Sequence, residues 1–149
     1  MSKKILVIGY GHVGATIADV MEDFGNNIIR IDPKLNDKRT KDWKMVAEGA
    51  VICLPTPTVN GKCDVSLIDE TVEELGDMRI LIKSTVLPDQ LTKYPDNVSY
   101  SPEFLREKNA RDDYDKQKYA VWGGERFQVG WWMGRFPDLN KQNVVTTRE

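Results

Sequence analysis

The chain has 149 residues, of which 40% are hydrophobic and 30% are charged, so we expect one globular domain over residues 1–149. Its 23 acidic and 21 basic residues give a net charge of -2, which favours neither a nucleic acid nor an anionic membrane as a partner. No apolar stretch approaches the length of a membrane span. The two cysteines make no disulfide framework, which suits the reducing cytoplasm.

The first part of the chain has the pattern of a strand, a glycine loop, a helix and a second strand. Four apolar β-formers at 5–8 run directly into a glycine-rich segment at 9–14. Residues 15–24 have a helical pattern, and an apolar strand over 27–31 ends at Asp32. This order is typical of a dinucleotide-binding unit.

Each part of the glycine loop has a mechanical task in such a unit. Gly9 permits the tight turn, Gly11 lets the backbone approach a pyrophosphate, and Gly14 lets the helix pack closely on the strand. The helix N-terminus offers unpaired N–H groups to the phosphates.

Asp32 follows Gly14 at nearly the spacing of about 20 residues that the dinucleotide fingerprint requires. A carboxylate there accepts hydrogen bonds from the adenosine ribose and repels a 2′-phosphate, so NAD is favoured over NADP. Arg30 and Lys34 flank Asp32 and are the residues that would favour a 2′-phosphate. The alternative is that the glycines form an ordinary turn and Asp32 merely begins a loop.

The segment after Asp32 is short. It predicts one helix over 40–48, ended by Gly49, and then a buried strand over 50–54. A complete half of the fold would need a crossover helix and a third strand here. We therefore expect that outer strand to be missing or vestigial, with the strand that ends at Asp32 near a sheet edge.

The remaining chain alternates between strand and helix patterns. Ser66 is the predicted N-cap of a helix that Gly76 ends. Gly123-Gly124 is expected to end a later strand, the one over 119–122. The other predicted strands cover 79–83, 98–100, 119–122 and 143–146, and a helix covers 125–136. This alternation predicts an α/β, Rossmann-like, doubly wound and mainly parallel sheet, shortened after its second strand.

Three later motifs narrow this interpretation. In order they are Ile-Cys-Leu-Pro-Thr-Pro-Thr at 52–58, Lys-Ser-Thr-Val-Leu-Pro at 83–88 and Ser-Pro-Glu-Phe-Leu-Arg-Glu at 101–107. Together with the glycine loop they resemble the N-terminal NAD-binding domain of the UDP-glucose/GDP-mannose dehydrogenase family. The resemblance covers nearly the whole chain, most loosely after Gly124. It implies an enzyme that oxidises the C6 alcohol of a nucleotide sugar to a carboxylate with two NAD.

The resemblance also implies residue roles. Asp32 would hold the adenosine ribose, and the pyrophosphate would be held by Gly9, Tyr10, Gly11, His12, Val13 and Gly14. Thr56 would contact the cofactor, and Thr85 would hold a catalytic water beside it. Glu103 and Glu107 match the two glutamates of the family motif, the later one assisting proton transfer or positioning water. Lys108 stands where the family usually has glycine. The backbone expected to face the nucleotide sugar is that of Phe104, Leu105 and Arg106.

The residues support this placement independently, because ligands of an open parallel sheet sit outside the carboxyl ends of its strands. Thr85 and Glu107 would then pair around a water as hydroxyl and carboxylate. The alternative is structural: Ser84 and Thr85 would cap a turn, and Glu103 and Glu107 would lie on a solvated helix face.

The family's chemistry also needs a nucleophilic cysteine from a C-terminal domain that lies outside this sequence. We expect Cys53 to pack as a small hydrophobe and Cys63 to be a poor nucleophile. His12 is expected at the cofactor phosphates or as a helix cap, and the sequence predicts no metal site.

Three functional hypotheses follow from these residues. The first is an NAD-binding component of an oxidoreductase whose cysteine domain comes from a separate polypeptide. The possible partners of the chain are that catalytic polypeptide or further copies of itself in a homo-oligomer. The second is a non-catalytic NAD-binding regulatory or partner subunit, and the third is a degenerate, truncated family member.

The aromatic segment near the C-terminus has two interpretations. Its apolar members are Phe127, Val129, Trp131, Trp132, Met133 and Phe136. They pack the last helix on the sheet, or they form an exposed patch for self-association or a partner.

Overall fold

The computed structural model describes residues 4–9, 11–32, 46–137 and 141–147. The strands are β1 (Lys4–Ile8), β2 (Ile28–Ile31), β3 (Ala47–Ile52), β4 (Thr58–Val59), β5 (Lys62–Cys63), β6 (Arg79–Ile82), β7 (Val98–Tyr100), β8 (Tyr119–Gly124) and β9 (Gln142–Thr147). The helices are α1 (His12–Asp23), α3 (Ser66–Leu75), α4 (Pro88–Leu91), the 3-10 turn η1 (Glu107–Asn109), α5 (Ala110–Lys116) and α6 (Arg126–Met133).

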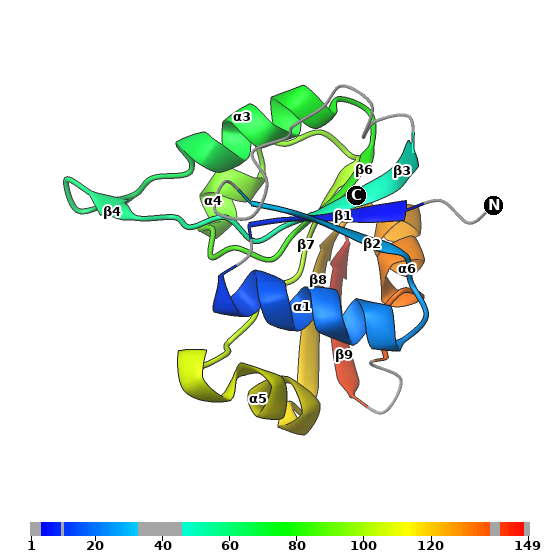
Figure 1. The fold of residues 1–149 in the computed structure, drawn as a ribbon. Helices are drawn as coiled ribbons and strands as arrows, with labels where there is room; N and C mark the ends of the chain where they lie inside the picture. The colour runs from blue at the N-terminus through cyan, green and yellow to red at the C-terminus, as the bar shows by residue number, and fades with distance from the viewer. Residues whose placement is uncertain (1–3, 10, 33–45, 138–140, 148–149) are drawn as a thin grey trace.

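The main sheet runs in the order β2-β1-β3-β6-β7-β8-β9, and β4 and β5 form a separate hairpin. Its neighbouring strands are parallel except for the pair β7 and β8. Figure 1 shows α3 and α4 on one face of the sheet and α1, α5 and α6 on the other. The doubly wound, mainly parallel fold is therefore confirmed. Within the described residues β2 is an edge strand, as predicted.

The alternation of side chains along β1 builds two cores. Leu6 and Ile8 face the α3 side, whereas Ile5 and Val7 face the side of α1 and α6. All four of these side chains are buried. Burial on both faces explains why the sequence of the strand is continuously apolar. Because β1, β2, β3 and β6 are parallel, their carboxyl ends lie at the same edge of the sheet.

Gly49 does not end a helix, and that prediction is wrong. Positions 40–45 lie outside the described residues, Val46 is helical, and β3 already begins at Ala47. Gly49 lies inside β3, where an added Cβ would stand 2.9 Å from the ring of Trp132. Its role is to make room for α6 against the sheet.

Two smaller predictions are corrected in the same way. Gly123 and Gly124 lie within β8 rather than after it. Ser66 is the first residue of α3, and the carboxylate of Asp64 accepts a hydrogen bond of 3.0 Å from its backbone N–H. Gly76 ends that helix as predicted.

The aromatic segment packs mainly into the core. Val129, Trp132 and Phe136 are buried, and Trp131 and Met133 pack partly against the same cluster. Phe127 alone of the six projects outward, with 79% of its surface exposed. The core interpretation is therefore confirmed for the segment as a whole.

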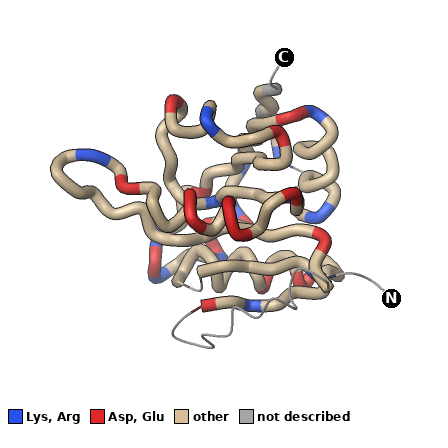
Figure 2. The backbone as a smooth tube through the Cα atoms, turned by 90° about the horizontal axis from the view of Figure 1, so that it is seen from above, with Lys and Arg blue, Asp and Glu red and all other residues tan. Residues whose placement is uncertain are grey.

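Charged residues of both signs are spread over the surface. Figure 2, viewed from the α3 side, shows acidic positions along that helix, where Glu70, Glu73 and Glu74 are exposed. None of the helices in the described ranges is long and apolar enough to cross a membrane.

Candidate functional site

A cavity of about 650 Å³ opens at the carboxyl ends of β1, β3 and β6. Parts of the chain that are far apart in sequence meet there: the glycine loop, α3, and the segments that follow β2, β3, β6 and β7. The lining residues are Gly9, Gly11, His12, Val13, Asp32, Cys53, Leu54, Pro55, Thr56, Leu67, Lys83, Ser84, Thr85, Glu103 and Leu105. This is the edge at which ligands of open α/β sheets bind.

The glycine loop has the geometry that a phosphate cradle requires. Gly9 has a φ of 93°, and an added Cβ would stand 2.7 Å from the Cys53 carbonyl oxygen. An added Cβ at Gly14 would collide with the Gly9 carbonyl group, so α1 lies directly against the turn. At Gly11 the same Cβ would meet no atom within 4 Å, so its backbone faces open space at the cavity wall. The N-terminus of α1 thus opens into the cavity, where it can attract an anion.

Asp32 lies at the end of β2 and lines the cavity, as its proposed contact with a ribose needs. The guanidinium of Arg30 donates 2.9 Å hydrogen bonds to Asp19 and Glu22 of α1. These acids compete with a ligand phosphate for Arg30. Lys34, and Tyr10 of the glycine loop, lie outside the described residues.

Hydrogen bonds join the segment after β3 to the segment after β6. The Thr56 hydroxyl donates to the Thr85 carbonyl oxygen at 2.9 Å, and the Cys63 thiol donates to the same oxygen at 3.7 Å. The Ser84 hydroxyl donates to the Leu54 carbonyl oxygen at 2.6 Å. The exposed Thr85 is therefore held by its backbone while its side chain lines the cavity.

Lys83 and Glu103 form an ion pair in the cavity wall. Their side chains are only 1% and 4% exposed. The Lys83 ammonium also donates to the Ser101 hydroxyl at 3.2 Å and lies 4.9 Å from the centre of the Phe136 ring. One oxygen of the pair, Oε2 of Glu103, is buried and has no hydrogen-bond partner among the residues that the structure describes. A paired buried charge with one unsatisfied oxygen indicates a place where a ligand or water can donate.

Neither cysteine is disulfide-bonded. Burial raises the pKa of Cys53 to about 12, the nearby Lys83 ammonium opposing this and Glu103 adding to it. At neutral pH Cys53 is therefore a thiol rather than the thiolate that nucleophilic catalysis requires.

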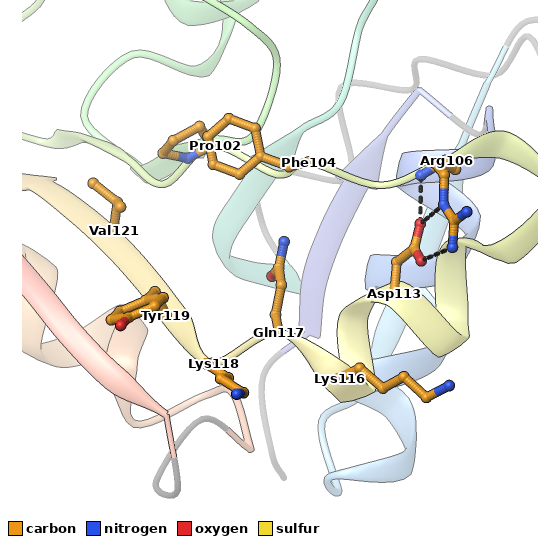
Figure 3. Close-up of a pocket in the computed structure, with 9 residues that line it drawn as sticks. All are labelled: Pro102, Phe104, Arg106, Asp113, Lys116, Gln117, Lys118, Tyr119 and Val121. Atoms are coloured by element: carbon orange, nitrogen blue, oxygen red, sulfur yellow. Dashed lines mark hydrogen bonds and ion pairs between the residues drawn. The ribbon is translucent and has the colours of Figure 1, made fainter.

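The loop from Pro102 to Arg106 separates the cavity from a second hollow, of about 480 Å³. Glu103 and Leu105 line the cavity. Pro102, Phe104 and Arg106 line the hollow, as an extended chain that alternates its side chains allows. Figure 3 shows the hollow, with Phe104 beside Pro102. The Phe104 ring is 73% exposed there.

Arg106 anchors the end of this loop to α5. Its backbone N–H, Nε and Nη2 all donate to the Asp113 carboxylate, at 2.8, 3.1 and 2.8 Å (Figure 3). These hydrogen bonds lower the pKa of Asp113 to about 2. Because the Arg106 side chain is bound to Asp113, it holds the end of the Pro102–Arg106 loop in place. The expected contact of the Phe104, Leu105 and Arg106 backbone with a nucleotide sugar stays a prediction.

The Arg106–Asp113 pair is expected to persist in acid. Because folding depresses the pKa of Asp113, its stabilising contribution is present at neutral pH and is lost only as the pH falls towards about 2. Carboxyl carbon NMR should show the Asp113 titration near that value in the native chain and nearer 3.8 in Arg106→Gln. A midpoint near 3.8 in both proteins would contradict the bidentate pair.

The structure brings most, but not all, of the expected residues together. Thr56, Thr85 and Glu103 meet in the cavity, whereas the exposed Glu107 at the start of η1 does not line it. Thr85 therefore shares the cavity with Glu103 rather than with Glu107. Lys83 was not identified from the sequence as the ion-pair partner of Glu103. The available signal was the two-residue spacing of Leu81 and Lys83, which places both side chains on the same, buried face of the sheet.

The described part of the chain holds no group of three or more His, Cys, Asp or Glu side chains suited to a metal ion. His12 lies at the first turn of α1 and lines the cavity. It therefore shares the cavity wall with Gly9, Gly11 and Val13.

No family model matches the chain. Among curated proteins it is similar to the UDP-N-acetyl-D-mannosamine dehydrogenase of Methanococcus vannielii, with 26% identity over 133 residues, covering 63% of this chain and 31% of the relative. The corresponding protein of Methanococcus maripaludis is 24% identical over 130 residues, covering 61% and 30%. The chain therefore spans about a third of the length of these relatives.

Solved structures show the same fold. A GDP-mannose dehydrogenase from Pseudomonas aeruginosa, in a ternary complex, superposes with a TM-score of 0.80 at 21% identity, covering 97% of this chain and 46% of that one. A UDP-glucose dehydrogenase from Pyrobaculum islandicum gives 0.75 at 16% identity, covering 99% and 46%. In both comparisons the chain spans less than half of the solved structure.

Proposed function

We propose that this chain, which is similar to the N-terminal portion of nucleotide-sugar dehydrogenases, binds NAD as the cofactor-binding part of such an oxidoreductase. The observation that carries the proposal is the cavity in which the glycine loop, the α1 N-terminus and Asp32 line one wall. The backbone around Gly11 would receive the pyrophosphate, together with His12 and Val13. Asp32 would accept hydrogen bonds from the adenosine ribose.

The opposite wall of the cavity supports a place for the nicotinamide half. When bound, NAD supplies the hydride acceptor for oxidation of an alcohol. Thr56 and Thr85 would border the ring, and Glu103 would offer a buried acceptor. Glu107 remains a proposed proton-transfer residue, for which a substrate or a further chain would have to reach its exposed position at η1.

A nucleotide sugar is the proposed substrate, and the backbone of Phe104, Leu105 and Arg106 would face it. The thiol nucleophile of a full oxidation to the carboxylate is proposed to come from outside these residues, because the raised pKa of Cys53 keeps it protonated. That observation also favours a second candidate, an NAD-binding subunit that does not turn over by itself. The two differ in whether NADH forms when nucleotide sugar, NAD and a cysteine-bearing partner polypeptide are combined.

Replacement of Asp32 by asparagine tests the cofactor assignment. Calorimetry should show that NAD binds the native chain more tightly than NADP, and that Asp32→Asn weakens NAD by about tenfold or more, because a charged acceptor is lost. The affinity for NADP should fall little, since the same change also removes the repulsion between the Asp32 carboxylate and the 2′-phosphate. Asp112→Asn, which breaks an exposed pair with Lys116 on α5, is the matched control and should leave both affinities unchanged. Equal binding of NAD by both variants would count against the proposal.

A further inference from the structure

Lys83 is unusual in its surroundings, because it is a cation among aromatic rings. Its ammonium lies 5.4 Å from the centre of the Trp122 ring and 4.9 Å from that of Phe136. Trp122 and Phe136 are fully buried members of the α1 and α6 core. Burying an unpaired lysine here would cost a large amount of folding free energy, so Lys83 can be buried only because it pairs with Glu103.

Glu103 has the complementary problem. One carboxylate oxygen accepts from Lys83, and the other, Oε2, is buried and unpartnered among the described residues. Glu103 itself lines the cavity proposed for NAD. An ionised carboxylate is an acceptor at both oxygens, so Oε2 calls for an N–H or O–H donor at this point.

We propose that Lys83 is a positioning residue: it holds Glu103 ionised in one orientation, so that Oε2 accepts a hydrogen bond from a donor in the cavity. Glu103 then acts as a fixed acceptor rather than as a group that exchanges protons. The inference rests on the proposed NAD site and adds to it a residue that acts only through Glu103. The donor is either the carboxamide NH₂ of the nicotinamide or an ordered water.

The pair also isolates the carboxylate from other titrating groups. Within the described part of the chain, Lys83 from the end of β6 and Cys53 from the end of β3 are ionisable groups near it, and Cys53 stays a thiol at neutral pH. His12 and Asp32 line other parts of the same cavity. Removal of Lys83 leaves a buried carboxylate without its cation, which favours uptake of a proton.

The test is NAD affinity as a function of pH, measured by calorimetry on the native chain and on Lys83→Met. The native affinity should be nearly the same at about pH 5.5 and at about pH 8.5. In Lys83→Met it should fall at the lower pH by about tenfold more, because a protonated Glu103 loses its charged acceptor. Lys93→Met, in which the lost ammonium is exposed and paired with Asp69, should keep the native profile. Native affinity and profile in a folded Lys83→Met would overturn the inference.

A second variant covers the case in which Lys83→Met does not fold. Lys83→Met/Glu103→Leu removes both charges and leaves no unpaired ion, so its fold should survive. It should bind NAD about tenfold more weakly at both pH values, without added pH dependence. Native affinity in this variant would equally overturn the inference. Absence of NAD binding by the native chain would instead refute the proposed function, so the two failures are distinct.

The same titration identifies the donor. In 3-acetylpyridine adenine dinucleotide a methyl group replaces the amide nitrogen, so the analogue cannot donate at that position. If the native chain binds it about tenfold more weakly than NAD, the donor is the carboxamide. If both bind equally while Lys83→Met weakens both, the donor is an ordered water. Either result supports the positioning role, and equal binding of both dinucleotides by all variants contradicts it.

Discussion

Replacement of Gly14 by alanine is expected to cost the fold about 3 kcal/mol of unfolding free energy, the upper part of the usual range for overpacking. The added Cβ would collide with the Gly9 carbonyl oxygen and stand 2.9 Å from its carbon. These are backbone atoms of a turn held at a φ of 93°, so no flexible side chain can give way. The gain of about 1 kcal/mol that alanine brings to a helix offsets only part of this cost.

Urea unfolding followed by circular dichroism measures the effect of Gly14→Ala. Gly130→Ala in α6 is the matched control, since an added Cβ there meets no atom within 4 Å, and it should stabilise the protein by about 0.5–1 kcal/mol. Gly11→Ala is the functional counterpart. It should keep the native unfolding midpoint yet weaken NAD by about tenfold or more, because its Cβ projects into the open space proposed for the pyrophosphate. Native stability in Gly14→Ala would contradict the packing described for the loop.

Replacement of Lys83 by methionine is expected to cost about 3–5 kcal/mol, as breaking a buried ion pair typically does. The loss comes from leaving Glu103 charged and without its cation in a wall where its side chain is 4% exposed. The double replacement Lys83→Met/Glu103→Leu should recover most of this, because no unpaired charge remains.

Lys93→Met is the control for the same chemical change at the surface. Its ammonium contacts Asp69 at 2.9 Å, and both side chains are more than 40% exposed, at 45% and 43%. Its loss should therefore change stability by about 1 kcal/mol or less. Denaturant midpoints of Lys83→Met, Lys83→Met/Glu103→Leu and Lys93→Met, each compared with the native chain, measure these losses of stability. Equal losses in Lys83→Met and Lys93→Met would show that Glu103 does not depend on its partner.

Features that are local in the sequence could be predicted closely. The glycine loop and Asp32 belong to one continuous strand–helix–strand unit, so their spacing already carries the geometry. The short segment after Asp32 likewise predicted the edge position of β2. The three later motifs each follow a strand. Because the carboxyl ends of parallel strands lie at one edge of a sheet, the motifs predicted that their residues would meet there.

Features that depend on distant partners could not be predicted. The start of β3 was missed because pairing of Lys4 with Ala47 extends the strand, which local propensity does not reveal. The pairing of Lys83 with Glu103 arises because β6 and β7 are neighbours whose carboxyl ends meet. Glu107 was placed by motif alone, and the turn η1 carries it away from the cavity.

The most direct test of the NAD site is a map of where the cofactor binds, made by following backbone amide shifts of the ¹⁵N-labelled chain as NAD is added. We expect saturable shifts at Gly9, Gly11 and Asp32 and at Thr85 and Glu103 across the cavity, all with one dissociation constant. We expect much smaller shifts at Tyr119 and Val121, which line the separate hollow. No saturable shift up to about 1 mM NAD, an affinity of only about 4 kcal/mol, or shifts confined to the hollow, would contradict it.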